Sequence, residues 1–281
     1  MEQAGGKERD AIKAGFDWYV EKISATIFKP VEEFLKEIDR LIIVPHLSLH
    51  YLPFSALINT EGRRLIEKYE IVNLPSPRLL KKTGKTVTLS KLNALIIGNP
   101  LGDLKYAGKE ARIISKILLN SKLLSGKNAN KAAILKLLPD YSILHFACHA
   151  RIDYDKPLFS GLIVSDGKGC KARIELNEIL EIKNKADLVV LSGCETSGGN
   201  ITPGDEITCF PRAFMYSGAS SLLVSLWEID DNSTSEFMKY FYTELYVNGK
   251  TKSEALEMAQ LQMVEAGYSP YHWSGFQLVG T

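Results

Sequence analysis

The sequence predicts an α/β fold, a three-layer sandwich in which helices cover both faces of a mostly parallel central sheet. Three observations support this prediction. Short apolar runs recur along the chain, and they are continuous blocks of Val, Ile and Leu, which is typical of parallel strands buried on both faces. Charged stretches with apolar residues at helical spacing lie between most of the runs. Strands that alternate with helices in this way favour a sheet sandwiched between two helical layers.

The predicted elements follow one another along most of the chain. A charged stretch at 8–39 has helical spacing, and Pro30 interrupts it. The predicted strands cover 40–45, 70–75, 93–100, 141–149, 186–194, 220–227 and 276–280. The predicted helices cover 105–119, 128–138, 175–183, 205–217, 232–247 and 251–266. We therefore expect an N-terminal helical segment over 1–39 and a main domain over 40–281, with a candidate seam at the loop-like stretch 76–91.

Composition narrows the classes of partner. The net charge is +1, so no whole-molecule field attracts nucleic acid or a membrane surface. No apolar run approaches the roughly 20 residues of a membrane span, and the polar N-terminus lacks the apolar core of a signal peptide. Four cysteines in a chain of 281 residues do not suggest a disulfide framework. We therefore expect a cytoplasmic protein with no direct nucleic-acid binding and no membrane partner.

Two reactive side chains stand at the ends of predicted strands. The run 141–149 ends in His149, and the run 186–194 ends in Cys194. In open α/β sheets the working groups lie beyond the carboxyl ends of the strands. A histidine can take the proton of a nearby thiol, the thiolate can attack a carbonyl, and the imidazolium can then protonate the leaving amine. The residues alone leave a catalytic pair and a structural pair about equally open.

The neighbouring histidine and cysteines have simpler interpretations. His145 lies inside the apolar run, and we expect it to form hydrogen bonds within the fold. Cys148 alternates to the opposite face of the strand and is expected in the core. Cys170 falls in a predicted hairpin turn and Cys209 in a predicted helix, and neither is assigned a function. No CxxC or HxxxH pair among these histidines and cysteines has a matching second half, so we expect no metal.

Five ordered blocks of sequence resemble the CHAT domain family, which are cysteine peptidases related to caspases and separases. The blocks are HFACHA (145–150), PLFSGLIV (157–164), ADLVVLSGCET (186–196), GDEITCFPRAFMYSGASSLLVSLWEIDD (204–231) and YHWSGFQLVG (271–280), and LIIVPHLSLHYLPFSALIN (41–59) also matches. The resemblance covers roughly residues 40–280. It implies a caspase-like sandwich and a cysteine endopeptidase without a cofactor, with His149 as general base and acid and Cys194 as nucleophile. The order is that of caspases, in which the histidine lies about 50 residues upstream of the cysteine.

The resemblance also implies an oxyanion hole at the two strand ends. In caspase-like enzymes its donors are the backbone N–H groups of the cysteine and of the residue after the histidine, here Cys194 and Ala150. The family usually has glycine where this chain has Ala150, which keeps the N–H donor but restricts the backbone. Gly193 is expected to give the chain space to turn beside the nucleophile.

A specificity pocket is implied by the stretch SLWEIDD. Separases carry an acidic residue shortly after a Leu-Trp pair, and that residue binds an arginine of the substrate. Asp231 stands at this position with Asp230 beside it, and Ser192 is a further candidate for substrate contact. The alternative, weighed equally, is that Asp230 or Asp231 caps the helix that begins near residue 232.

The biological role follows from the resemblance alone. It implies an effector in prokaryotic defence or signalling that cleaves a protein substrate, with a regulatory protein or an RNA-guided complex as a candidate partner. We expect the loop 195–206 after the nucleophile to order when substrate or partner binds. The main alternative is a catalytically silent caspase-like binding scaffold. A nucleotide or small-ligand binder is disfavoured because no glycine-rich phosphate loop is present.

Overall fold

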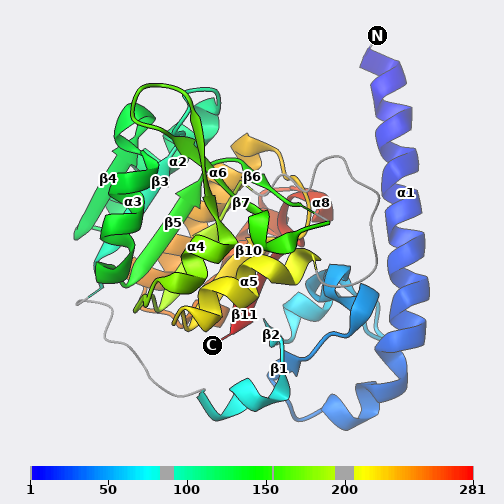
Figure 1. Cartoon of the computed structure of the whole chain (residues 1–281). Coiled ribbons are helices and arrows are strands. Elements are labelled where there is room, and N and C mark those ends of the chain that lie inside the picture. Colours follow the sequence, from blue (N-terminus) through cyan, green and yellow to red (C-terminus); the bar gives the residue numbers. More distant parts are fainter. Residues whose placement is uncertain (1, 83–91, 154, 194–205, 281) are drawn as a thin grey trace.

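The computed structural model describes residues 2–82, 92–153, 155–193 and 206–280, with the backbone alone for 2–14, 79, 81–82 and 206–208. Within these residues the chain forms an α/β sandwich around a large, mostly parallel sheet (Figure 1). The eight strands of that sheet lie in the order β1-β2-β11-β10-β9-β5-β3-β4. The fold class predicted from the sequence is confirmed.

The centre of the sheet consists of parallel strands whose residues are nearly all buried. They are β3 (Ala94–Gly98), β5 (Ile143–Ala147), β9 (Leu188–Leu191) and β10 (Ser221–Ser225). The strand β4 (Ser121–Ser125) lies at one edge and β11 (Phe276–Gly280) pairs antiparallel with β10. Because β5 pairs with β9, and β9 with β10, the carboxyl ends of these three strands meet at the same edge of the sheet.

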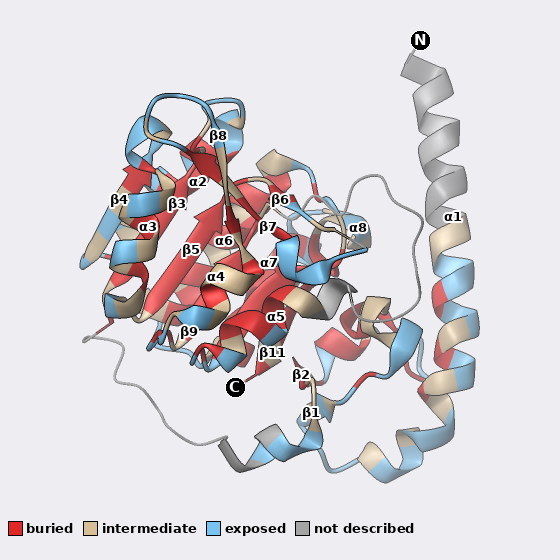
Figure 2. Ribbon diagram, viewed as in Figure 1, coloured by how far each residue is buried: buried red, intermediate tan, exposed pale blue. Residues whose placement is uncertain are grey.

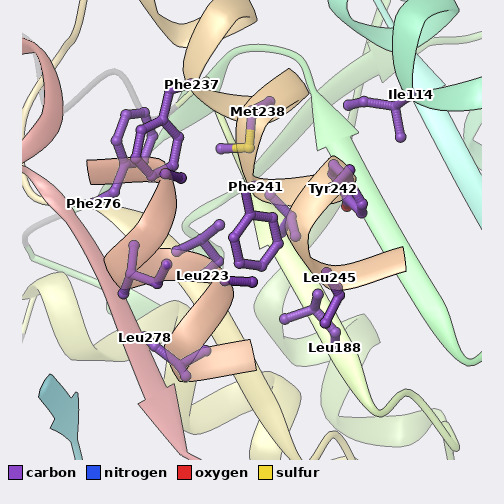
Figure 3. Packing of buried hydrophobic residues seen from close by; sticks show 14 of the residues in the cluster. Ile114, Leu188, Leu223, Phe237, Met238, Phe241, Tyr242, Leu245, Phe276 and Leu278 are labelled. Atoms are coloured by element: carbon purple, nitrogen blue, oxygen red, sulfur yellow. The ribbon is translucent and has the colours of Figure 1, made fainter. Parts of the chain in front are cut away.

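Helices cover both faces of the sheet and define two cores. One face packs against α2 (Lys105–Ile117), α6 (Asp231–Tyr242) and α7 (Lys252–Glu265), and the other against α3 (Lys131–Leu137), α4 (Leu176–Glu181) and α5 (Glu206–Tyr216). Alternate residues of β3 serve the two cores: Ile96 faces the first and Leu95 the second. Figure 3 shows the first core, where the rings of Phe237 and Phe276 stack with centroids 3.9 Å apart.

The N-terminal part adds two strands to the edge of the sheet. The helix α1 (Glu2–Ile27) ends before Pro30, and the 3-10 helix η1 (Lys29–Leu35) follows, as the proline predicts. The strands β1 (Arg40–Ile43) and β2 (Glu70–Asn73) then pair in parallel, and β2 contacts β11. A small core around Phe54 and Tyr69 supports this part (Figure 2).

Several elements of the described residues were absent from the sequence prediction. A separate antiparallel sheet consists of β6 (Ala150–Arg151), β7 (Gly161–Ser165) and β8 (Lys171–Glu175). The edge strand β4 and the short helix α8 (Pro270–Trp273) were also missed, and a π-helical turn at Thr243–Val247 ends the predicted helix 232–247. Of the missed strands, β4, β6 and β8 lie at sheet edges and few of their residues are buried, whereas β7 is the central strand of its small sheet. The predicted turn around Cys170 does join β7 to β8.

Candidate active site

The exits of β5 and β9 lie side by side. Phe146 pairs with Leu191, and the Ser192 N–H donates to the Phe146 carbonyl at 3.1 Å. The Ser192 hydroxyl, 8% exposed as a residue, also donates to this carbonyl at 3.4 Å. Its side chain therefore helps to join the two strands, and a contact between Ser192 and substrate stays a prediction.

The next residue shows how closely the two exits approach. A Cβ atom at Gly193 would overlap the backbone carbonyl of Cys148. Glycine is required because another main chain occupies the space where a side chain would stand. The residue before Cys194 therefore touches the residue before His149. Cys194 itself, its N–H group and the loop that follows it to residue 205 lie outside the described residues, so their predicted roles and the expected ordering of the loop stay predictions.

His149 lies just beyond β5, with its side chain 22% exposed. Its Nε2 atom lies 3.2 Å from Oδ2 of Asp103, a residue in the turn between β3 and α2. This carboxylate was missed in the sequence. The stretch NPLGD after the third predicted strand was a usable signal, since it places an acidic residue in a turn beyond a strand adjacent to β5.

Ala150 begins β6 and pairs with Leu162 of β7. The neighbouring carbonyl of His149 accepts a hydrogen bond from Ile163 N at 2.8 Å. Hydrogen-bonded and non-hydrogen-bonded pairs alternate along an antiparallel ladder, so the Ala150 N–H points away from β7. Among the described non-glycine residues, positive φ occurs at Leu47 and Asn99 and not at Ala150, so alanine fits here without strain.

The two acidic residues after β10 have different environments. Asp230 caps α6, because its carboxylate accepts a hydrogen bond from Ser233 N at 2.9 Å. The capping alternative is therefore correct for Asp230. Asp231 is the first residue of α6, and no described residue forms a hydrogen bond or ion pair with its carboxylate.

Asp231 also differs from Asp230 in its electrostatic environment. Partial burial raises the pKa of Asp231 above its ordinary value, and the negative charges of Glu110 and Asp230 add to this effect. His149 is the charge that acts in the opposite direction, which places Asp231 within electrostatic reach of the catalytic candidate. The β10 exit thus presents a half-buried carboxylate at the edge of the sheet that carries His149.

The Leu-Trp pair before these residues is firmly anchored. The Trp227 ring stacks on Tyr271, and its Nε1–H donates to the Tyr271 carbonyl at 2.9 Å. A Cβ at Gly275 would crowd this ring, so the glycine of the block YHWSG makes room for the tryptophan. The two sequence blocks therefore fix the path of the chain into Asp231.

His145 is enclosed within the sandwich. Its Nδ1 lies 3.1 Å from the Tyr242 hydroxyl, and its Nε2 lies 2.9 Å from Glu110 Oε1 in a contact that is not aligned as a hydrogen bond. Burial, followed by the charge of Glu110, raises the pKa of Tyr242 well above its ordinary value. The structural role predicted for His145 and the core position predicted for Cys148 are both confirmed.

Within the described ranges, no group of three or more His, Cys, Asp and Glu side chains is arranged to hold a metal ion. In the same part of the chain, no helix combines the length and apolar character that crossing a bilayer demands.

Most of the chain matches a known protein family. The sequence profile of the CHAT domain matches residues 18–281. The chain belongs to the CHAT domain family. Tetratricopeptide repeat protein 28 from mouse and from human contains a similar region, with 26% and 28% identity over 86% of this chain. That region is 12% of the length of each of these relatives.

Solved structures similar to this CHAT domain are caspase-like cysteine peptidases. Separase from Saccharomyces cerevisiae, solved with securin, has a TM-score of 0.57 and 18% identity over 86% of this chain and 15% of its own. The Arg-specific cysteine proteinase gingipain R has a TM-score of 0.59 and 12% identity over 98% of this chain and 75% of its own. At these identities the likeness shows a shared fold.

Proposed function

We propose that this CHAT domain is a cysteine endopeptidase in which His149 and Cys194 form the catalytic pair. One observation carries the proposal: the close approach of Gly193 to the Cys148 carbonyl. It brings the residues before the nucleophile and before the base into contact at the carboxyl edge of the sheet. Two neighbouring strand exits, one followed by an imidazole and the other by a thiol, are the arrangement that thiol activation requires.

The reaction follows from this arrangement. His149 takes the proton of the Cys194 thiol, the thiolate attacks the scissile carbonyl, and the imidazolium protonates the leaving amine. Water then hydrolyses the acyl-enzyme with His149 as base. The Ala150 N–H, directed away from β7, is suited to donate to the oxyanion, together with the N–H of Cys194. No metal or cofactor is required for these steps.

The substrate residue before the cut is proposed to be basic. No described residue forms an ion pair with Asp231, and Glu110, Asp230 and Glu228 add negative charge around it. An arginine or lysine side chain would supply the missing positive charge. Arginine should be preferred, because its planar guanidinium can bind a carboxylate through two hydrogen bonds. The gingipain neighbour, which is described as Arg-specific, has the same fold.

The wider role is proposed on family grounds. The resemblance favours a regulated cytoplasmic effector in prokaryotic defence or signalling, with a protein substrate and a regulatory protein or RNA-guided complex as its trigger. Yeast separase was solved bound to securin, which supports control through protein contacts in this fold. The similarity to tetratricopeptide repeat protein 28, whose name denotes a repeat protein, favours the scaffold alternative.

A cysteine-directed electrophile on an arginyl peptide separates the two functions. We expect the purified chain to be labelled at one residue, Cys194, as located by mass spectrometry of the digested protein. The Cys194→Ala variant should lose the label. Cys170→Ala is the matched control, because Cys170 is an exposed thiol in the β7–β8 turn.

Each other outcome identifies a different error. A label that persists in Cys194→Ala and disappears in Cys148→Ala would show that the nucleophile is misassigned. A chain that takes no label, although it is folded, would support the binding scaffold. A label obtained equally well with a leucyl peptide would contradict the basic specificity but leave the catalytic pair intact.

A further inference from the structure

The turn between β3 and α2 contacts His149 through the side chain of Asp103. We propose that Asp103 is the carboxylate that orients the His149 ring, and that Asn99 is the positioning residue that holds Asp103 in place. The inference rests on the proposed peptidase function for its catalytic meaning. The geometry that carries it is the 3.2 Å separation between Asp103 Oδ2 and His149 Nε2.

Asn99 has an unusual backbone conformation at the start of this turn. Its φ is +47°, in the left-handed region that most side chains avoid and that Asn tolerates better than most. Outliers of this kind persist where surrounding contacts hold them, and they cluster at functional sites. The contacts around Asn99 identify what the strained residue supports.

Asn99 is bonded to both sides of the His149–Asp103 pair. Its backbone N–H donates to the Ala147 carbonyl at 2.9 Å, and Ala147 is the last residue of β5, two residues before His149. Its side-chain Oδ1 accepts from Leu104 N at 3.0 Å, and Leu104 directly follows Asp103. One residue therefore fixes the position of the strand that carries the base and of the turn that carries the acid.

The other contacts of this turn also hold Asp103 in place. Gly102 N donates to the Asn99 carbonyl at 3.3 Å, which closes a β-turn with Pro100 at its second position. Gly102 has a φ of +81°, and α2 begins two residues after Asp103. Asp103 is thus held between a closed turn and a helix start, although its own side chain is 45% exposed.

The chemical consequence concerns the histidine tautomer. A carboxylate next to Nε2 favours a hydrogen on that nitrogen, so Nδ1 carries the lone pair and acts as the base. The thiol proton of Cys194 then moves to Nδ1, and the same N–H later passes its proton to the leaving amine. The Nε2–H stays hydrogen-bonded to Asp103, which remains a carboxylate throughout. An amide at residue 103 could donate to Nε2 instead and stabilise the wrong tautomer.

Nitrogen NMR of the imidazole tests the tautomer without any need for activity. The chain has five histidines, and loss of one set of signals in His149→Ala assigns His149. At alkaline pH, in a Cys194→Ala background, we expect the hydrogen on Nε2. In the same background Asp103→Asn should shift the population toward the Nδ1–H form. The enclosed His145 serves as an internal reference that should not change. Equal tautomer populations with and without the carboxylate would overturn the proposal.

Kinetics then test the positioning role. We expect Asp103→Asn to lower kcat by about 10- to 100-fold with little change in KM, less than in a buried triad because the pair is partly exposed. Asn99→Gly keeps the left-handed backbone but removes the acceptor for Leu104 N, and should lower kcat in the same way by a smaller factor. Asn99→Asp keeps an acceptor oxygen and should recover most of that loss.

The same kinetic measurements apply to the control variant and show which results would contradict the assignment. Asp39→Asn is the matched control, because Asp39 is exposed at the start of β1, away from the site. A kcat for Asp103→Asn within twofold of the parent, or a loss in Asn99→Gly that Asn99→Asp does not recover, would contradict the assignment. If no variant, including the parent, cleaves peptides, the proposed function fails, and the tautomer measurement still decides the His149–Asp103 pair.

Discussion

Two histidines on the same face of the β5 segment each have a carboxylate neighbour, but their surroundings differ sharply. His145 lies within the strand, its side chain 0% exposed, between Glu110 and Tyr242. His149 lies beyond the strand end, 22% exposed, beside Asp103. In both pairs Nε2 faces the carboxylate, and both carboxylates come from the β3–α2 segment. Residue type and pairing therefore do not separate the two histidines.

Position relative to the sheet edge separates them. Inside the sandwich a histidine and a carboxylate lose contact with water and can be tolerated only with partners. At the strand exit the same pair keeps access to solvent and lies next to the exit of β9. We therefore expect His145 to affect the stability of the fold and His149 to affect catalysis, and this division can be broken by experiment.

The largest expected effect is on catalysis. His149→Ala should lower kcat for peptide cleavage by about 10⁴-fold or more, because the thiol would lose its adjacent base. The unfolding temperature should stay near that of the parent, since the side chain is partly exposed and lies outside the strand. Turnover of an arginyl peptide and thermal unfolding are measured on the same preparation. The exposed His46 provides the control variant His46→Ala, and a large loss of stability in His149→Ala would contradict the division.

The next effect is on stability and concerns the enclosed pair. His145→Leu should lower the free energy of unfolding by about 3–5 kcal/mol, because Glu110 would remain buried without its partner. The double variant His145→Leu/Glu110→Leu should recover part of this loss, since apolar replacement of both partners removes the uncompensated group. Denaturant unfolding of the parent, both single variants and the double variant gives the coupling between the two residues. Strictly additive losses would show that the pair does not act as a unit.

The sequence predicts the central sheet more completely than it predicts the candidate site. The buried strands were found because both of their faces are apolar, as in the block ADLVVLSGC that contains β9. The position of His149 just beyond a strand followed from the same pattern, although β5 itself ends at Ala147. Edge strands such as β6 and β4 were missed, because few of their residues are buried and neither forms a continuous apolar block.

Contacts between distant segments could not be read from the sequence. Asp103 lies 46 positions before His149, and only the pairing of β3 with β5 brings their exits together. The division of roles between Asp230 and Asp231 was also open, because either residue can cap a helix that begins at this point. The hydrogen bond from Ser233 N to Asp230 decides it. Such assignments depend on the start of α6 to within one residue, which propensity does not fix.

Asp231, the proposed specificity carboxylate, sharpens the comparison, since it adds an acidic group within electrostatic reach of His149. Asp231→Asn keeps the size of the side chain and removes its charge. It should reduce kcat/KM for arginyl substrates by at least about tenfold, equal to roughly 1.4 kcal/mol. Cut sites in a peptide library should fall after arginine or lysine. Predominant cuts after leucine or methionine that Asp231→Asn does not change would remove Asp231 from the specificity pocket.

The smallest expected effect is the decrease in the free energy of unfolding that the charged Asp231 carboxylate causes at neutral pH. Burial first, and then the charges of Glu110 and Asp230, raise the pKa of Asp231 above 3.8, so the folded chain binds this proton more tightly than the unfolded chain. As pH rises from 3.8 through the raised pKa, the free energy of unfolding therefore falls, and the deficit is complete above that pKa. Asp231→Asn should be slightly more stable than the parent at pH 7, by no more than about 0.5 kcal/mol because water screens the half-exposed group. The difference should shrink toward pH 4, where the folded carboxyl takes up its proton.

Thermal unfolding of both proteins from pH 4 to pH 8, with Asp39→Asn as control, measures this dependence. A difference of the opposite sign, with the parent more stable at pH 7, would mean that the carboxylate already has a cationic partner within the chain and is not held ready for one on a substrate.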